Sequence, residues 1–104
     1  MARREDAPSS LIIGGTRYII EKRNLLCEAM ICDPDILFDL KSKTLRLYCP
    51  KGKAFVVDVE HDMTGRHDPP EVITREEAFK IMDKYPEGIN ESVYEKYFGA
   101  PEEL

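Results

Sequence analysis

The chain has 104 residues, of which 42% are hydrophobic and 34% are charged, and its formal net charge is −5 at pH 7. This length and composition predict one soluble domain with a single core. The excess of acidic residues argues against sequence-independent binding to nucleic acid, which needs clustered Lys and Arg side chains.

No segment of the sequence predicts export or a membrane span. The apolar runs are shorter than the roughly 18 residues that a spanning helix needs. Residues 1–10 carry charge without the apolar stretch of a secretory signal. The cysteines are an odd number, Cys27, Cys32 and Cys49. We therefore expect reduced thiols, a cytoplasmic location and no contact with a membrane.

Two apolar runs, at 11–13 and 16–22, are separated by Gly14-Gly15. Glycine accepts the positive φ angles that tight hairpin turns require. The pattern predicts a first β-hairpin, preceded by a polar, disordered tail at 1–10.

The segment 25–32 fits either a strand or a short helix. A strand would place Leu25, Cys27, Ala29 and Ile31 on one apolar face. Its Leu, Glu, Ala and Met residues also favour a helix, but the flanking turn residues leave room for only about two helical turns. We therefore predict a strand.

The next segment, 33–42, has two interpretations. Asp33-Pro34 is a typical helix start, with Asp as the N-cap and Pro at the first helical position. The alternation of Ile36, Phe38 and Leu40 fits a strand equally well. We prefer one short helical turn, and both alternatives remain open.

The stretch 44–60 predicts the central β-hairpin. Two runs rich in Leu, Val, Tyr and Phe flank the turn sequence Pro50-Lys51-Gly52-Lys53. Only one face of this hairpin is strongly apolar, so another element must cover that face. Its expected core side chains are Leu45, Leu47, Cys49, Phe55, Val57 and Val59.

Two helices are predicted after a loop at 61–71. Thr74 and Glu77 fit a capping box, and Pro86 would end the helix that they begin. Asn90 would cap a second helix at 91–98, which Gly99 ends. The predicted fold is α+β: a small, mostly antiparallel sheet of four or five strands, followed by two C-terminal helices packed on one face.

Short motifs lie along the chain: Leu47-Tyr48, Lys51-Gly52 before Phe55, Glu76-Glu77-Ala78, and Tyr94-Glu95 before Phe98-Gly99. They resemble the motifs of a group of small, uncharacterised bacterial accessory proteins often found on plasmids and phages. The resemblance covers most of the chain and implies a bacterial origin and the order of strands before helices, but no activity. The element pattern itself predicts a single domain at 11–99 with a solvated tail at 100–104.

Two His-Asp doublets are the most suggestive candidates for chemistry. His61, Asp62, His67 and Asp68 could together bind a divalent transition metal, as in a metal-dependent hydrolase. The simpler interpretation is a solvated polar loop, and the three cysteines do not have a structural zinc spacing. We therefore expect no cofactor and keep the hydrolase as the alternative function.

The stretch 58–77 contains seven acidic residues against two basic ones, Arg66 and Arg75. Such a strip could imitate a nucleic-acid backbone and occupy a basic site on another protein. The basic residues around the central hairpin, Arg46 among them, are expected to charge a sheet edge against strand pairing. The candidate partner-binding residues are Asp58, Glu60, Asp62, Asp68 and Glu71.

These observations favour a non-enzymatic protein-interaction module over an enzyme, since no coherent catalytic set is present. We expect a protein partner. An unpaired edge strand is also compatible with a homodimer.

Overall fold

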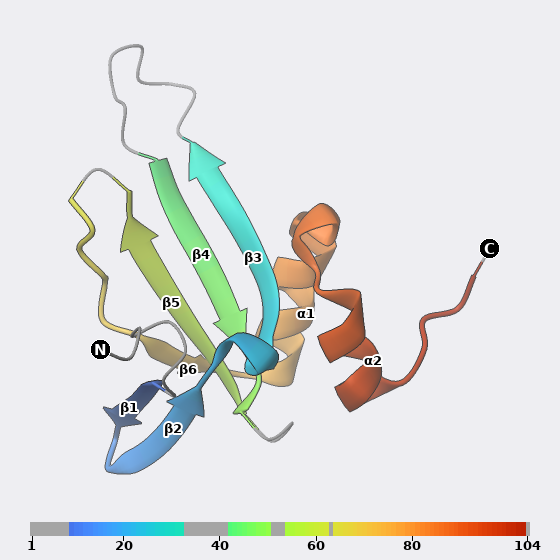
Figure 1. Cartoon of the computed structure of the whole chain (residues 1–104), viewed down its shortest axis with the longest axis horizontal. Helices are drawn as coiled ribbons and strands as arrows, with labels where there is room; N and C mark the ends of the chain where they lie inside the picture. Colours follow the sequence, from blue (N-terminus) through green and yellow to red (C-terminus); the bar gives the residue numbers. More distant parts are fainter. Residues whose placement is uncertain (1–8, 33–41, 51–53, 63, 104) are drawn as a thin grey trace, which may run out of the picture.

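The computed structural model describes residues 9–32, 42–50, 54–62 and 64–103. Four antiparallel strands form one sheet in the order β3-β4-β5-β6, and β1 and β2 form a separate hairpin. Two helices, α1 and α2, cover one face of the larger sheet (Figure 1). The predicted α+β class, with its helices last, is confirmed. The strands are β1 (Ser9–Ile13), β2 (Thr16–Ile20), β3 (Leu25–Cys32), β4 (Ser42–Tyr48), β5 (Phe55–His61) and β6 (Glu71–Ile73).

The central hairpin forms as predicted, from β4 and β5. Its register places Leu47 opposite Val57 and Arg46 opposite Asp58. Leu47, Cys49 and Phe55 of the predicted apolar face are buried beneath the helices. Alternation does not account for all of β5, because Val56 on the opposite face is fully buried and the expected core residue Val59 is only partly buried. The three residues 51–53 of its predicted turn lie outside the described part of the chain.

The segment 25–32 is the predicted strand. Cys27 and Ala29 are buried as expected, but Leu26 is also fully buried. The register between β3 and β4 shifts between Leu25 and Cys27. A bulge of this kind places consecutive side chains toward the core, which simple alternation does not predict. The open choice between helix and strand at 33–42 falls almost entirely outside the described residues, although Ser42 begins β4.

The predicted loop at 61–71 is partly ordered against the sheet edge. His67 forms an isolated β-bridge with Glu60, and the short strand β6 then pairs with β5. The prediction missed this strand because three residues are too few to show a period of two, and Pro69-Pro70 directly precedes it.

Both helices begin and end where the sequence indicated, although the Asn90 side chain accepts from the Ser92 hydroxyl and makes no capping hydrogen bond to the backbone of α2. In α1 (Arg75–Lys84), the Thr74 hydroxyl accepts from the Glu77 amide and the Glu77 carboxylate accepts from the Thr74 amide, which is the predicted capping box. A single 3-10 turn, η4 (Pro86–Gly88), joins α1 to α2 (Glu91–Phe98). Helical side chains such as Met82 and Val93 complete the core.

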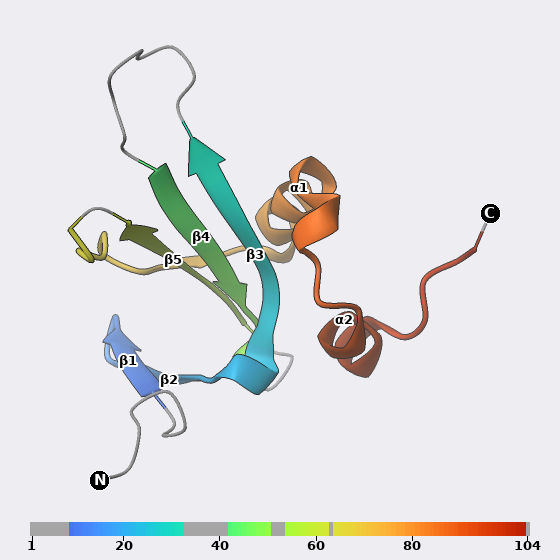
Figure 2. The ribbon, with the colours of Figure 1, turned by 45° about the horizontal axis from the view of Figure 1, so that its top comes forward.

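The β1–β2 hairpin stands apart from the helices (Figure 2). Its two-residue turn is Gly14-Gly15, with φ angles of 58° and 84°. The 3-10 turn η2 (Lys22–Asn24) connects it to β3. Asn24 is buried at this junction, where its side-chain amide donates to the Ile19 carbonyl and its oxygen accepts from the Tyr97 hydroxyl. This residue therefore ties the hairpin to α2.

Candidate functional site

The face of the sheet that α1 and α2 leave uncovered carries the polar side chains. Along β4, Leu45 and Leu47 point toward the helices, so Thr44 and Arg46 point the other way. Arg46 lies in register between Glu28 of β3 and Asp58 of β5. We call the residues Glu28, Arg46, Asp58, Glu60 and Asp62 the acidic face.

Arg46 is the centre of this face. Its Nε donates to Glu28 Oε2 at 2.7 Å, and its Nη1 donates to Glu60 Oε1 at 2.6 Å. Burial opposes the charge of Arg46, but the hydrogen bonds to Glu60 and Glu28 outweigh burial and raise its pKa. The same contact lowers the pKa of Glu60, chiefly through the hydrogen bond from Arg46. The guanidinium therefore joins carboxylates of β3 and β5 and favours the charged form of Glu60.

Asp62, directly after β5, is fixed by two hydroxyl groups of β4. Ser42 Oγ donates to Asp62 Oδ2 at 2.6 Å, and Thr44 Oγ1 donates to Asp62 Oδ1 at 2.8 Å. These hydrogen bonds lower the pKa of Asp62 although the carboxylate is exposed. Asp62 is therefore an oriented anion on the surface.

Asp58 pairs with an imidazole from the neighbouring loop. His67 Nδ1 lies 2.9 Å from one carboxylate oxygen of Asp58 and 3.1 Å from the other. The β-bridge between Glu60 and His67 places this ring beside β5. Asp58 is only 8% exposed, so its carboxylate is buried beneath the exposed side chains of the acidic face.

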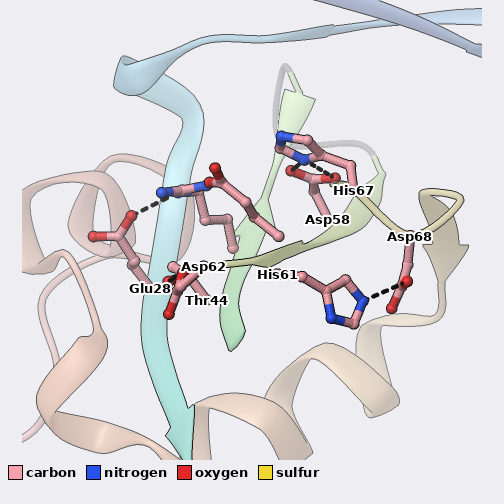
Figure 3. Close-up of polar contacts among 9 residues, drawn as sticks. Glu28, Thr44, Asp58, His61, Asp62, His67 and Asp68 are labelled. Atoms are coloured by element: carbon pink, nitrogen blue, oxygen red, sulfur yellow. Dashed lines mark hydrogen bonds and ion pairs between the residues drawn. The ribbon is translucent and has the colours of Figure 1, made fainter. Parts of the chain in front are cut away.

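The second histidine lies on the other side of the strand. His61 is an odd number of residues from Asp58 along β5, and its Nε2 lies 2.7 Å from Asp68 Oδ1. In Figure 3 the two imidazoles point away from each other. The hydrogen bond with His61 lowers the pKa of Asp68.

The four candidate metal ligands therefore do not converge, because each one is hydrogen-bonded in one of three separate places. His61 meets Asp68, His67 meets Asp58, and Asp62 meets Ser42 and Thr44. Across the described ranges, no three His, Cys, Asp or Glu side chains are grouped so that they could hold a metal ion.

The candidate partner-binding acids divide between the two sides of the sheet. Asp58, Glu60 and Asp62 belong to the acidic face. Asp68 binds His61 on the other side, and the register of β6 puts Glu71 beside Val57, whose side chain packs toward the core. The five predicted acids therefore do not form one strip.

Sequence reasoning missed Glu28 and misplaced Arg46. Arg46 was expected at a sheet edge, but β4 is an inner strand with β3 and β5 on either side. A turn at 50–53 would pair position 46 with position 57, one residue from the observed pairing of Arg46 with Asp58, so the turn sequence indicates that β5 is a neighbour of β4 but not the exact partner of Arg46. Glu28 requires the pairing of β3 with β4, which no local pattern specifies.

Among the described residues, no helix has the length and apolar character needed to cross a membrane. No protein-family model, curated protein or solved structure matches this chain.

Proposed function

We propose that this chain is a small, non-enzymatic protein-interaction module of the bacterial accessory genome, and that its acidic face binds a basic surface on a partner protein. One observation carries the proposal. Three adjacent strands and the turn after β5 bring four carboxylates together against a single guanidinium, that of Arg46. Excess negative charge on one face attracts and orients a positively charged partner.

The acidic face is also organised before binding. Glu60 and Asp62 both have lowered pKa values, because hydrogen bonds from Arg46 and from Ser42 and Thr44 favour their charged forms. Fixed side chains lose little conformational entropy when a partner binds. The face would therefore present a defined pattern of anions rather than a diffuse negative charge.

A more specific form of the proposal is an inhibitor that mimics nucleic acid. Glu28 on β3 and Glu60 on β5 lie on either side of Arg46, and Asp62 follows β5, so their carboxylates form a fixed pattern of anions along one face, as backbone phosphates do. A cytoplasmic location fits this role, because nucleic-acid-binding partners are found there.

The test compares two doubly neutralised variants with the wild type. Glu28→Gln combined with Asp62→Asn neutralises the acidic face, whereas Glu76→Gln combined with Glu95→Gln removes the same charge from exposed helical positions. Each tagged protein is incubated with a bacterial lysate, and retained proteins are identified by mass spectrometry. We expect one basic protein to be retained by the wild type and the helical variant and lost by the acidic-face variant.

Two results would contradict the proposal. The first is equal retention by the acidic-face variant, which would place the partner elsewhere. The second is a stoichiometric content of zinc, manganese or iron in the purified protein, measured by elemental analysis, which would favour the metal-dependent hydrolase. In that case His67→Ala should lower the metal content.

A further inference from the structure

A cleft of about 260 Å³ is lined by residues of α1, of α2 and of the segments that connect and follow them, on the helical side of the molecule and away from the acidic face. Its lining exposes polar and apolar surface in similar amounts, and two carboxylates, Asp83 and Glu91, belong to it. The apolar lining includes Phe79, Met82, Ile89 and Tyr94.

The aromatic walls are held in place by their neighbours. Phe98 packs edge-on against Phe79, with ring centroids 5.2 Å apart, and its centroid lies 5.1 Å from that of Tyr94. The guanidinium of Arg75 lies over the rings of Phe79 and Phe98, at 5.2 and 5.3 Å from their centroids. The aromatic cluster beside the cleft therefore already accommodates one guanidinium of the chain itself.

The two carboxylates of the cleft have no cationic partner within the described part of the chain. Asp83 is in the last turn of α1 and Glu91 is in the first turn of α2, and both are exposed. The adjacent Lys84 lies over the ring of Tyr85 instead, with its Nζ 5.5 Å from the ring centroid. Glu87 adds a further negative charge to the η4 turn between them. The cleft therefore combines apolar side chains with negative charge.

Its size and chemistry specify an occupant. The volume lies below the roughly 300–1,000 Å³ of sites that enclose drug-sized ligands, but it suits one long side chain. An apolar stem with a cationic head matches apolar walls and a carboxylate rim. Arginine fits better than lysine, because its planar guanidinium stacks on aromatic rings, pairs with carboxylates through two hydrogen bonds, and is weakly hydrated.

We propose that this cleft binds an arginine side chain that projects from a protein partner. That the partner is basic rests on the proposed function. That the side chain is an arginine rests on the lining of the cleft. The cleft adds a second contact, on the opposite side of the molecule from the acidic face.

The first experiment is a titration of the ¹⁵N-labelled protein with the capped peptide Ac-Gly-Gly-Arg-Gly-Gly-NH₂, followed by NMR. We expect the largest chemical-shift changes at Met82, Ile89 and Tyr94. A peptide with citrulline in place of arginine keeps the shape without the charge and should bind at least tenfold more weakly. The lysine peptide should bind at least threefold more weakly, and equal binding of the lysine peptide would overturn the assignment to arginine.

Matched variants separate the cleft from general electrostatics. Asp83→Asn combined with Glu91→Gln should weaken binding of the arginine peptide at least tenfold. Glu76→Gln combined with Glu95→Gln removes the same charge from the same two helices outside the cleft, and should change binding less than twofold. All four positions are exposed, so the thermal unfolding midpoints should be similar. Equal weakening by both variants, or wild-type shifts away from the cleft, would overturn the inference.

The design also distinguishes the two proposals. Glu28→Gln with Asp62→Asn should leave the affinity for the arginine peptide unchanged, because those residues are on the other side of the sheet. Loss of the lysate partner in that variant alone would support the acidic face. Failure of the wild type to bind the arginine peptide would reject the cleft and leave the acidic face untouched.

Discussion

Gly88 has no side chain, and this allows the connection between the two helices to pack directly against the sheet. A Cβ atom at this position would lie 2.2 Å from the carbonyl oxygen of Glu28 and 3.4 Å from the sulfur of Cys27. The next two residues continue the contact, since Ile89 forms a β-bridge with Cys27 and the Asn90 amide donates to the Leu26 carbonyl. The connection between α1 and α2 thus lies directly against the edge of β3.

The first prediction concerns Gly88→Ala. The added methyl group must displace either η4 or β3, so we expect the free energy of unfolding to fall by about 1–3 kcal/mol, as in overpacked cores. The displacement should also expose Cys27, whose thiol is buried and whose pKa is raised by burial and by Glu87. Urea unfolding measures the first effect, and mass-spectrometric mapping of thiol alkylation measures the second.

Gly65→Ala is the matched control for this change. Gly65 has a φ of 68°, and a Cβ atom added there would meet no other atom within 4 Å, so the cost is conformational only. This control should lower stability without accelerating alkylation of Cys27. If Gly88→Ala leaves the alkylation rate of Cys27 unchanged, then Gly88 does not hold η4 against β3.

Among the elements, the β1–β2 hairpin is the least supported. A two-stranded ribbon is marginally stable by itself. Ile12 is 67% exposed and Ile19 is 37% exposed, so a substantial part of its apolar surface is in solvent. Among the described residues, one side-chain hydrogen bond joins it to the remainder of the fold, from Asn24 to the Ile19 carbonyl at 3.2 Å.

The second prediction is that amide hydrogens of β1 and β2 exchange with solvent faster than those of β4, because β4 is paired on both sides. Asn24→Ala should widen this difference, since it removes the contacts to Ile19 and to Tyr97. It should also lower the free energy of unfolding by about 1–3 kcal/mol, as expected for a buried polar side chain that loses its partners. Native-state hydrogen exchange and urea unfolding measure the two effects.

Tyr97→Phe provides the control, because it removes only the contact between Asn24 and α2. The hairpin amides should then exchange at nearly the wild-type rate. If the two variants accelerate exchange equally, then Asn24 supports the hairpin through α2 and not through its own bond to Ile19.

For the whole molecule, the carboxylates couple stability to pH. Glu60, Asp62 and Asp68 all have lowered pKa values, caused chiefly by hydrogen bonds from Arg46, Ser42 and His61 respectively. A carboxylate with a lower pKa in the folded state binds fewer protons when folded than when unfolded. Its stabilising contribution is therefore present above the unfolded pKa of about 4, and is lost as the pH falls through the folded value.

The third prediction follows from this linkage. The urea midpoint of the wild type should fall as the pH is lowered below about 4.5, and Asp62→Asn should reduce that pH dependence. Glu71→Gln removes the same charge from an exposed position without a hydrogen bond to another described residue, and should preserve it. Parallel pH profiles for the two variants would show that the hydroxyl contacts of Asp62 do not contribute.

The sequence by itself determined the elements whose signals are local. Thr74 and Glu77 located the start of α1 through a capping box, Asn90 and Gly99 bounded α2, and Gly14-Gly15 marked the turn of the first hairpin. These signals depend on backbone hydrogen bonds and φ angles within a few residues, so the neighbouring sequence is sufficient to specify them. The alternation along β4 identified the side chains that pack beneath the helices for the same reason, but along β5 it missed the buried Val56.

Only the tertiary structure decided which side chains meet. The bulge that buries Leu26, the contact of His67 with Asp58, and the placement of Arg46 between Glu28 and Glu60 all depend on the register between strands. A shift of one residue exchanges the two faces of a strand, and no local pattern measures that register. For this reason the sequence named acidic residues without their partners, and the fold distributed them over two sides of one sheet.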